Sequence, residues 1–287
     1  MRILEHPEEM QAVADEWRAG GLRVGLVPTM GALHEGHLSL VRAARDDCDR
    51  VAASIFVNPT QFGQGEDYDT YARPFERDVS LLEEEGCDLI FAPSVEDMYG
   101  GTTLDLSPDG ERIYVEAGGL GEIWEGETRP GHMRGVATVV AMLLNIARPH
   151  RAYFGEKDYQ QLKLIQRMVQ NLFFGVEIVG CPTKRDPDGL AISSRNANLS
   201  AEERKAALVL PRALRTALDL AEAGERDAGR LVAEMKRACE DQALVQLHYA
   251  AVVNAETLAP LQTIDGPARA LISANVGATH LIDNMAL

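Results

Sequence analysis

Cysteine and basic side chains are both scarce in this 287-residue chain. Its four cysteines are scattered and form no C-x-x-C pair, so neither a disulfide framework nor a cysteine-based metal site has support, and we expect free, mostly buried thiols. The 28 lysines and arginines are outnumbered by 44 acidic side chains, which gives a net charge of −16. Proteins that bind nucleic acid usually carry a basic surface that neutralises phosphates. The charge therefore predicts that the chain has no nucleic-acid partner.

Long apolar runs are also missing. None approaches the ~20 residues that a membrane-spanning helix needs. The first residues, MRILEHPEEMQAVADEW, are acidic and amphipathic, whereas a secretory signal begins with basic residues followed by an apolar core. With 46% hydrophobic and 25% charged residues, the composition is ordinary for a globular protein. We expect a cytoplasmic protein that does not bind membranes.

Over its first two thirds, the chain alternates short β-branched runs with helical patterns. Such alternation is typical of parallel βαβ units, so we predict an α/β fold with a Rossmann-like open parallel sheet and helices on both faces. The helix from Asp158 is the clearest, with apolar residues on one face at Leu162, Ile165, Val169 and Leu172. The predicted strands are Arg23–Val27, Val51–Val57, Cys87–Ala92, Ala152–Phe154 and Val176–Val179. The predicted helices are His37–Cys48, Phe75–Glu85, Gly135–Ile146 and Asp158–Phe173.

The pattern changes beyond Ser200. Ser200 and Glu203 have the spacing of a capping box, which opens a helix, and Pro211 should kink that helix or divide it in two. Another helix near Asp227–Gln242 and strands near Leu247–Val253, Ala268–Ala274 and His280–Asp283 predict a smaller α+β domain. We therefore expect two domains, residues 1–189 and 190–287, the second acting as a lid.

Two histidines and two glycines lie where the first predicted strand leads into a helix, in the string PTMGALHEGH (Pro28–His37). A metal site, an acid–base pair and a phosphate cradle are the candidate chemistries. Zinc is disfavoured because H-E-G-H is one residue shorter than the H-E-x-x-H that puts both imidazoles on one helix face. Two surface histidines on a glycine turn are the simplest alternative. We favour phosphate, since glycines allow close approach and a helix N-terminus offers N–H groups and a positive dipole end.

Two further strings fit a phosphate ligand. Lys157, in FGEKDYQQL, stands at the start of the clearest helix, where an anion is already favoured, although it could be a solvated surface lysine. The string DGLAISSRN (Asp188–Asn196) places two serines and Arg195 in a long segment without regular structure, Lys184–Ser200, and could equally be a polar linker. A second such segment is Asn58–Pro74. The local positive charge that an acidic protein needs for a triphosphate would come from His34, His37, Lys157, Lys184, Arg185 and Arg195.

These strings carry a resemblance to known proteins. H-E-G-H resembles the H-x-G-H signature of the nucleotidylyltransferase superfamily, and the serine string resembles its mobile K-M-S-K-S loop, with Arg195 in place of the second lysine. Together with SIFVNPTQFG, RPGHMRGVATVV and LIDN, the strings stand in the order of the pantoate–β-alanine ligase family, over nearly the whole chain. The resemblance implies two steps: the carboxylate of (R)-pantoate attacks the α-phosphate of ATP, and the amine of β-alanine then attacks the resulting pantoyl adenylate, giving pantothenate and AMP.

The resemblance also implies roles for particular residues. His37, His34, Lys157 and Arg195 would be catalytic, with His37 a proton donor to phosphate. Gln61 and Gln161 would bind pantoate, and Gln61 would also border the β-alanine site. The ATP-binding residues would be Met30, Gly31, Ala32, Leu33, His34, Glu35, Gly36, His37, Gly155, Glu156, Lys157, Asp158, Lys184, Ile192, Ser193, Ser194 and Arg195. Magnesium would accompany ATP, with no protein ligand assigned, and the family is usually homodimeric.

Two positions depart from the family's pattern. Lys184 stands where an apolar residue is usual, and Ile192 where Met or Leu is common. Backbone contact with adenine would survive the first change, which leaves only the role of the side chain open. Alternative functions are a nucleotidylyltransferase with a phosphate acceptor and a binding module without turnover. A tRNA synthetase is the least favoured, because the chain is acidic and its C-terminal part is short.

Overall fold

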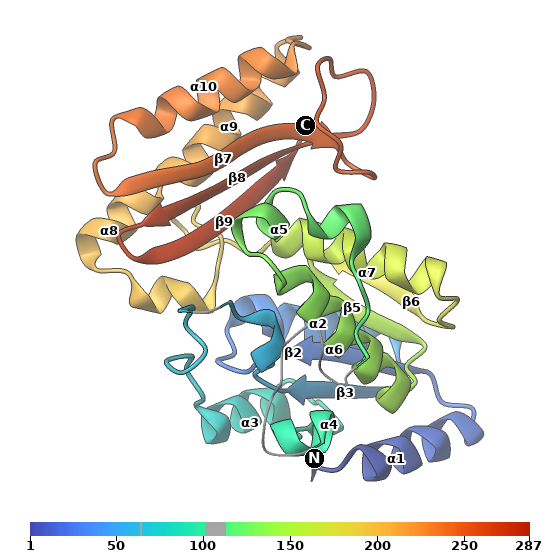
Figure 1. Cartoon of the computed structure of the whole chain (residues 1–287). Coiled ribbons are helices and arrows are strands. Elements are labelled where there is room, and N and C mark those ends of the chain that lie inside the picture. Colours follow the sequence, from blue (N-terminus) through green and yellow to red (C-terminus); the bar gives the residue numbers. More distant parts are fainter. Residues whose placement is uncertain (64, 101–112) are drawn as a thin grey trace. The chain divides into compact units, whose positions relative to one another are not determined.

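The structure, a computed structural model, describes residues 1–63, 65–100 and 113–287 (Figure 1). The chain forms two compact units, Met1–Glu156 with Leu164–Cys181, and Lys157–Lys163 with Pro182–Leu287. The second unit thus begins at Pro182 instead of residue 190, and it takes in a short segment, Lys157–Lys163, that the sequence assigned to the first. The lid role of the C-terminal part stays a prediction.

The first unit is built on a six-stranded sheet in the order β1-β4-β3-β2-β5-β6, in which every neighbouring pair runs parallel. From β2 the chain winds outward through β3 to β4, whereas β5 and β6 are added on the other side of β2. The direction of winding therefore reverses between β2 and β5. The strands are β1 (Arg2–Leu4), β2 (Val24–Thr29), β3 (Arg50–Ile55), β4 (Leu89–Phe91), β5 (Arg151–Gly155) and β6 (Glu177–Cys181).

Helices cover both faces of this sheet, as the alternating pattern predicts (Figure 1). Helix α2 contacts β2, β3 and β5, and its Val41 and Ala44 share a buried cluster with Val27 and Val51 of the sheet. Because strand side chains alternate, the buried Leu26 points to the other face, where α1 and α6 pack on each other and on β2. The helices are α1 (Pro7–Ala19), α2 (Glu35–Asp47), α3 (Phe75–Glu84), α4 (Val95–Tyr99), α5 (Glu125–Thr128), α6 (His132–Ala147) and α7 (Tyr159–Asn171).

The second unit packs helices on a three-stranded antiparallel sheet, β7-β8-β9, and so has the predicted α+β character. The capping box is present: the Ser200 side chain accepts from the N–H of Glu203, whose carboxylate accepts from the N–H of Ser200. The helix divides at Leu208, and Pro211 lies in the first turn of the next helix, where its missing N–H has no partner to lose. The elements are α8 (Ala201–Ala207), α9 (Val209–Glu222), α10 (Ala228–Glu240), β7 (Val245–Asn254), β8 (Ala268–Val276) and β9 (Thr279–Ala286).

Most of the predicted elements are present within a few residues of their expected bounds, and the differences have local causes. The three-residue strand β1 is too short to show a pattern, and neither it nor α1 was predicted. The placement of Leu172 on the core face was wrong: α7 ends at Asn171, and Leu172 is 53% exposed. All four cysteines are free and buried, as expected.

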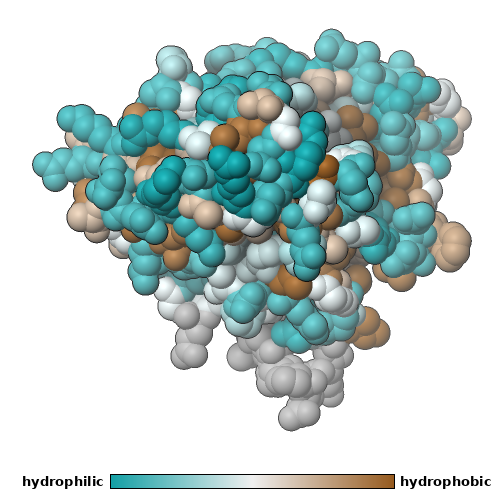
Figure 2. All heavy atoms as spheres, turned by 90° about the horizontal axis from the view of Figure 1, so that it is seen from above, coloured by the Kyte–Doolittle hydropathy of each residue, from teal (hydrophilic) through white to brown (hydrophobic). Residues whose placement is uncertain are grey.

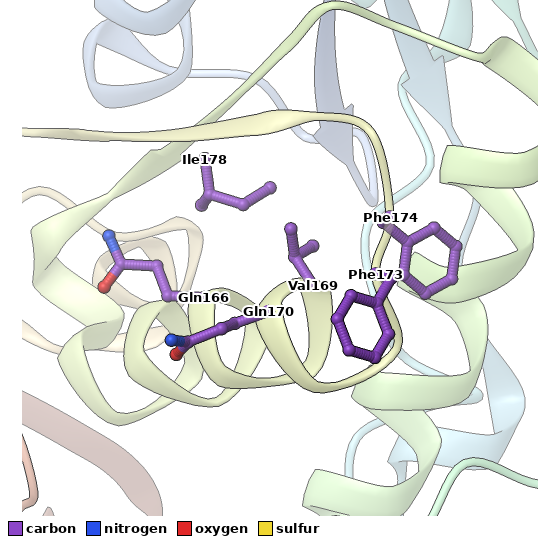
Figure 3. A pocket seen from close by; sticks show the side chains of 6 residues that line it. All are labelled: Gln166, Val169, Gln170, Phe173, Phe174 and Ile178. Carbon is purple, nitrogen blue, oxygen red and sulfur yellow. The ribbon is translucent and has the colours of Figure 1, made fainter.

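The surface is polar over the face drawn in Figure 2, where hydrophilic side chains predominate. Among the described residues, none of the helices has the length and apolar character needed to span a bilayer. A shallow hollow lies beside the end of α7 and the start of β6, and its lining is partly apolar and partly polar (Figure 3). The lining residues are Gln166, Val169, Gln170, Phe173, Phe174 and Ile178. The start of β6 belongs to the amino edge of the sheet, so this hollow lies away from the carboxyl edge at which β2 ends.

Candidate active site

The histidine string and the FGEKD string follow two adjacent strands at the point where the winding reverses. β2 ends at Thr29 and leads into Met30–His37, and β5, its hydrogen-bonded neighbour, ends at Gly155. In open parallel sheets, ligands bind outside the carboxyl ends of the strands at this switch point, because the loops there diverge and leave a crevice. The topology thus marks the same edge that the sequence motifs mark.

The turn after β2 is held by a buried carboxylate from α3. Asp78, 1% exposed, accepts from the backbone N–H groups of Ala32 at 2.7 Å and Leu33 at 2.8 Å. Burial raises the pKa of the Asp78 carboxyl, and these two backbone hydrogen bonds oppose the shift. Gly31 has a φ of +81°, and a Cβ there would lie 2.9 Å from an Asp78 oxygen. The turn is therefore shaped by glycine and anchored by Asp78.

The two histidines stand together at the start of α2. Their ring centroids are 4.0 Å apart with an interplanar angle of 22°, so the imidazoles are stacked. His34 is the N-cap and α2 begins at Glu35, which places the first backbone N–H groups and the positive end of the helix dipole beside both rings. The Glu35 carboxylate pairs with Arg42 at 2.7 Å. The group of Glu35 that is available to an incoming anion is therefore its backbone N–H, at the first position of α2.

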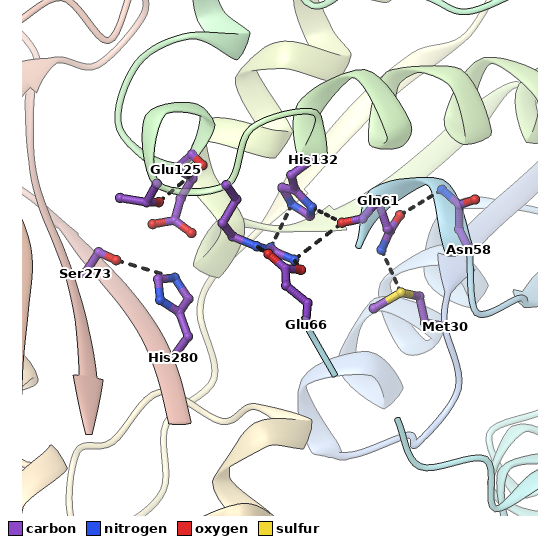
Figure 4. Close-up of polar contacts among 10 residues, drawn as sticks. Met30, Asn58, Gln61, Glu66, Glu125, His132, Ser273 and His280 are labelled. Atoms are coloured by element: carbon purple, nitrogen blue, oxygen red, sulfur yellow. Dashed lines mark hydrogen bonds and ion pairs between the residues drawn. The ribbon is translucent and has the colours of Figure 1, made fainter. Parts of the chain in front are cut away.

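Gln61 lies beside Met30, on the 3-10 helix Pro59–Gln61 (Figure 4). Its amide nitrogen is 2.7 Å from the Met30 sulfur, and its amide oxygen accepts from Asn58 at 3.2 Å. Asn58 also donates to the carbonyl oxygen of Gly135 in α6, where a Cβ would come within 2.2 Å of the Thr60 oxygen. Glycine at 135 therefore lets α6 approach the backbone of Thr60 closely. The segment Asn58–Pro74, which was expected to lack regular structure, forms a 3-10 helix at this point.

A hydrogen-bonded group of side chains, to which the sequence assigned no role, contacts the backbone carbonyl of Gln61 (Figure 4). His132 Nδ1 lies 2.7 Å from the Gln61 carbonyl oxygen, and its Nε2 lies 3.1 Å from an Arg129 nitrogen. Arg129 can only donate, so His132 accepts at Nε2 and donates from Nδ1 to Gln61. Burial and the nearby Arg129 charge lower the pKa of His132 to about 4. Glu66 pairs with Arg129 at 2.8 Å. Burial favours a higher pKa for the Glu66 carboxyl, but the ion pair with Arg129 outweighs burial, and the pKa is lowered.

The second unit carries the other predicted residues. Lys157 and Asp158 form a 3-10 turn just before α7, with the ammonium 3.3 Å from the Asp158 carboxylate. The half-buried Gln161 follows within the first turn of α7. The backbone carbonyl of Lys157 accepts from the Asn284 side chain at 2.8 Å, a contact that the LIDN string alone does not reveal.

The segment from Lys184 to the serines is an ordered hairpin. Arg185 pairs with Ala191 in an antiparallel bridge, and the N–H of Ile192 donates to the Lys184 carbonyl at 2.9 Å. The hairpin thereby brings Lys184 next to Ile192, and the resemblance assigns both residues to ATP binding. Beyond it, the Ser193 hydroxyl accepts from the N–H of Arg195 at 3.3 Å and caps a 3-10 helix, Ser194–Asn198.

The predicted site residues thus fall into two groups, each described within its own unit. Met30–His37, Gln61, Gly155 and Glu156 belong to the first unit, and Lys157, Asp158, Gln161 and the segment Lys184–Arg195 to the second. The sequence assigned no role to Asp78, Arg129, His132 and Asn284. Each of them acts through a partner that lies far away in the sequence. Among the described residues, no cluster of three or more His, Cys, Asp or Glu side chains could hold a metal ion.

Comparison with known proteins gives one consistent result. The family Pantoate-beta-alanine ligase matches residues 2–286. A pantothenate synthetase of Rubrobacter xylanophilus is 64% identical over 286 residues, 99% of this chain and 98% of that one, and one of Thermotoga petrophila is 50% identical over 287 residues, all of both. Among solved structures, a pantothenate synthetase from Thermus thermophilus has a TM-score of 0.90 at 46% identity, with 99% of each chain covered. A pantoate–β-alanine ligase from Francisella tularensis, complexed with β-γ ATP and β-alanine, has a TM-score of 0.79 at 34% identity and covers 100% of this chain and 97% of that one.

Proposed function

Since the chain belongs to the pantoate–β-alanine ligase family and is an ATP-dependent ligase of these two substrates, we propose that it forms the amide through pantoyl adenylate. A pantoate carboxylate oxygen attacks the α-phosphorus of ATP, and the bond to the bridging oxygen breaks as pyrophosphate leaves. The free amine of β-alanine then attacks the acyl carbon, loses a proton, and expels AMP. Activation is needed because a carboxylate is a poor acyl donor.

The observation that supports this proposal best is the position of the two phosphate strings. The loop after β2 and the loop after β5 follow adjacent strands at the switch point of the sheet, where such folds bind nucleotides. The first loop offers stacked imidazoles and the N-terminus of α2. Both features favour a ligand that carries several negative charges.

In the first step charge builds on phosphoryl oxygens, so the residues act mainly by position and by charge. We assign His37 as the proton donor to a phosphate oxygen, with the stacked His34 beside it. Lys157 and Arg195 neutralise the charge of the departing pyrophosphate, and Ser193 and Ser194 donate to it. Backbone groups of Met30–His37, Gly155–Asp158 and Lys184 hold the rest of the nucleotide.

Pantoate is assigned to the amides of Gln61 and Gln161, and Gln61 also borders β-alanine. A neutral amide can hold the hydroxyls or carboxylate of pantoate, whereas a close cation would quench the nucleophile. The preorganisation of Gln61 favours this role, since both ends of its amide are engaged and His132 holds its carbonyl. A fixed donor loses little entropy when the substrate binds.

Magnesium belongs to this proposal as a companion of ATP. Because the described residues offer no cluster of three ligating side chains, the donor set fits an ion held mainly by phosphate oxygens and water, as Mg²⁺ prefers. Bound there, the ion would neutralise phosphate charge. A cytoplasmic location and a homodimer are further parts of the proposal, and light scattering of the purified chain tests the second.

Pyrophosphate release from ATP tests the function. ATP with pantoate alone should release about one equivalent of pyrophosphate per site. Added β-alanine should convert this single burst into continued turnover, in which AMP is released as well. ATP with β-alanine alone should release none. The alternative, a nucleotidylyltransferase with a phosphate acceptor, predicts release with a phosphorylated acceptor and none with pantoate. Release that strictly requires β-alanine would contradict the adenylate intermediate.

A further inference from the structure

The last strand, β9, carries two buried polar residues at consecutive positions. Asp283 and Asn284 are each 4% exposed. Buried carboxylates and amides are costly unless they are hydrogen-bonded, so their partners show what they are for. Neighbouring residues of a strand point to opposite faces of the sheet, which lets this pair reach two different segments.

Asn284 holds the segment that contains Lys157. Its Nδ2 donates to the Lys157 carbonyl at 2.8 Å, and its Oδ1 accepts from Arg269 Nε at 2.7 Å. The Arg269 guanidinium carbon lies 3.7 Å from the centroid of the Tyr159 ring, and the Tyr159 hydroxyl donates to the Ala255 carbonyl at 2.9 Å. The turn before α7 is therefore fixed at Lys157 and again two residues later.

Asp283 holds the hairpin that leads to the serines. Its two carboxylate oxygens accept from the two terminal nitrogens of Arg185, at 2.7 Å and 2.9 Å. Arg185 also donates to the carbonyls of Gly189 and Asn284, at 3.1 Å and 3.2 Å. Bidentate pairs of this kind specify geometry as well as contribute energy. The base of the hairpin is therefore anchored to Asp283 and to the backbone of Asn284, whose side chain anchors Lys157.

We infer that Asp283 and Asn284 are positioning residues for adenylate formation, which tie Lys157 and the hairpin ahead of Ser193–Arg195 to one point on β9. The inference rests on the proposed roles of Lys157 and Arg195. An ammonium on a flexible stem helps a transition state only when its main chain is fixed, since small misplacements of a reacting group cost large factors in rate. Neither Asp283 nor Asn284 is a catalytic residue, because each acts through another side chain or backbone group.

Asn284→Asp tests the first contact. The carboxylate still accepts from Arg269 but cannot donate to the Lys157 carbonyl. We expect kcat for pyrophosphate release with pantoate to fall about tenfold, with the KM for pantoate little changed. Asn254→Asp is the matched control: it makes the same change in the same unit, where the side-chain oxygen that accepts from Glu256 and Thr257 is retained. Melting temperatures are measured for both, and rates are taken well below them. Equal losses of rate in the two variants would overturn the inference.

A double-mutant cycle separates this inference from the proposed function. If Asn284 acts through Lys157, Asn284→Asp should cost nothing further in a Lys157→Ala background. Independent, multiplicative losses would indicate a general structural role and would overturn the inference, while leaving the proposed function intact. A Lys157→Ala variant with the wild-type rate would instead refute the proposed role of Lys157, and the inference would fall with it.

Asp283→Asn tests the second contact in the same way. Asparagine is isosteric but gives up the charge that holds Arg185, so we expect the KM for ATP to rise severalfold. Combined with Arg185→Ala, the substitution should add little. A large rise in the KM for ATP that persists undiminished in the Arg185→Ala background would contradict the assignment of Asp283 to the hairpin.

Discussion

Gly36 leaves room for the imidazole of His34: a Cβ at position 36 would lie 2.9 Å from both Cε1 and Nδ1 of that ring. The ring could turn aside, but its stacking on His37, with centroids 4.0 Å apart, would then be lost. The glycine in H-E-G-H is therefore explained by packing of the first histidine.

Gly36→Ala should lower activity without lowering stability. Alanine is the better helix former in the first turn of α2, so the melting temperature should stay level or rise, while pyrophosphate release falls about tenfold as His34 moves. Gly229→Ala, at the equivalent place in α10, is the control and should keep full activity. Equal activities in the two variants would show that the position of the His34 ring does not matter.

His37→Ala should slow adenylate formation by at least tenfold and leave the fold intact. One charge-assisted contact to phosphate is worth roughly 1.5–3 kcal/mol, and its loss appears in the transition state. Single-turnover release of pyrophosphate with pantoate measures the effect, and the melting temperature reports the fold. A wild-type rate in this variant would remove His37 from the catalytic residues.

Zinc removal should leave the enzyme active. The spacing of H-E-G-H does not place both imidazoles on one helix face at i and i+4, and the described residues contain no cluster of three ligating side chains. The enzyme is dialysed against a chelator and then assayed with Mg²⁺ and ATP. Activity that is lost on dialysis and returns with zinc but not with Mg²⁺ would revive the metal interpretation of the two histidines.

Gln161→Ala and Lys157→Ala should give different kinetic signatures. Gln161 lies within the first turn of α7, past the turn that holds Lys157, so its loss should raise the KM for pantoate strongly and the KM for ATP little. Loss of about 1–2 kcal/mol of hydrogen bonding corresponds to roughly five- to thirtyfold in kcat/KM. Lys157→Ala should lower kcat even at saturating pantoate, since its charge matters most as pyrophosphate leaves. Identical signatures, with ATP binding equally impaired, would contradict this division of the two residues.

His132 should make the enzyme less stable in mild acid. Its pKa is about 4 in the folded chain and 6.5 in the unfolded one, so unfolding takes up a proton as the pH falls below 6.5. The stability present above pH 6.5 is therefore lost towards pH 4, by about 2 kcal/mol between pH 7 and pH 5. Urea unfolding at both pH values compares the wild type with His132→Gln. The unfolding free energy of the wild type, taken relative to that of the variant, should fall by that amount from pH 7 to pH 5, and a constant difference would show that folding does not lower the pKa of His132.

The sequence determined the features that depend on neighbours along the chain. Periodicity placed α2 and α7, since burial of one helical face follows from spacing alone. The spacing of Ser200 and Glu203 predicted a capping box, because both partners lie within one turn. The histidine loop and the FGEKD turn could be found for the same reason, as each combines glycine or a helix start with a histidine or lysine within a few residues.

Tertiary structure alone decided which of these pieces meet. The strand order places β2 beside β5, which are separated in the chain by β3 and β4, and no local pattern encodes that pairing. Asp78 holds the backbone of Ala32 from 46 residues away, and Asn284 holds Lys157 from 127 residues away. A buried carboxylate or amide must find a hydrogen-bonding partner, but its type does not say which backbone group that will be. The partner is supplied only by the tertiary fold, which brings a distant segment of the chain beside the buried side chain.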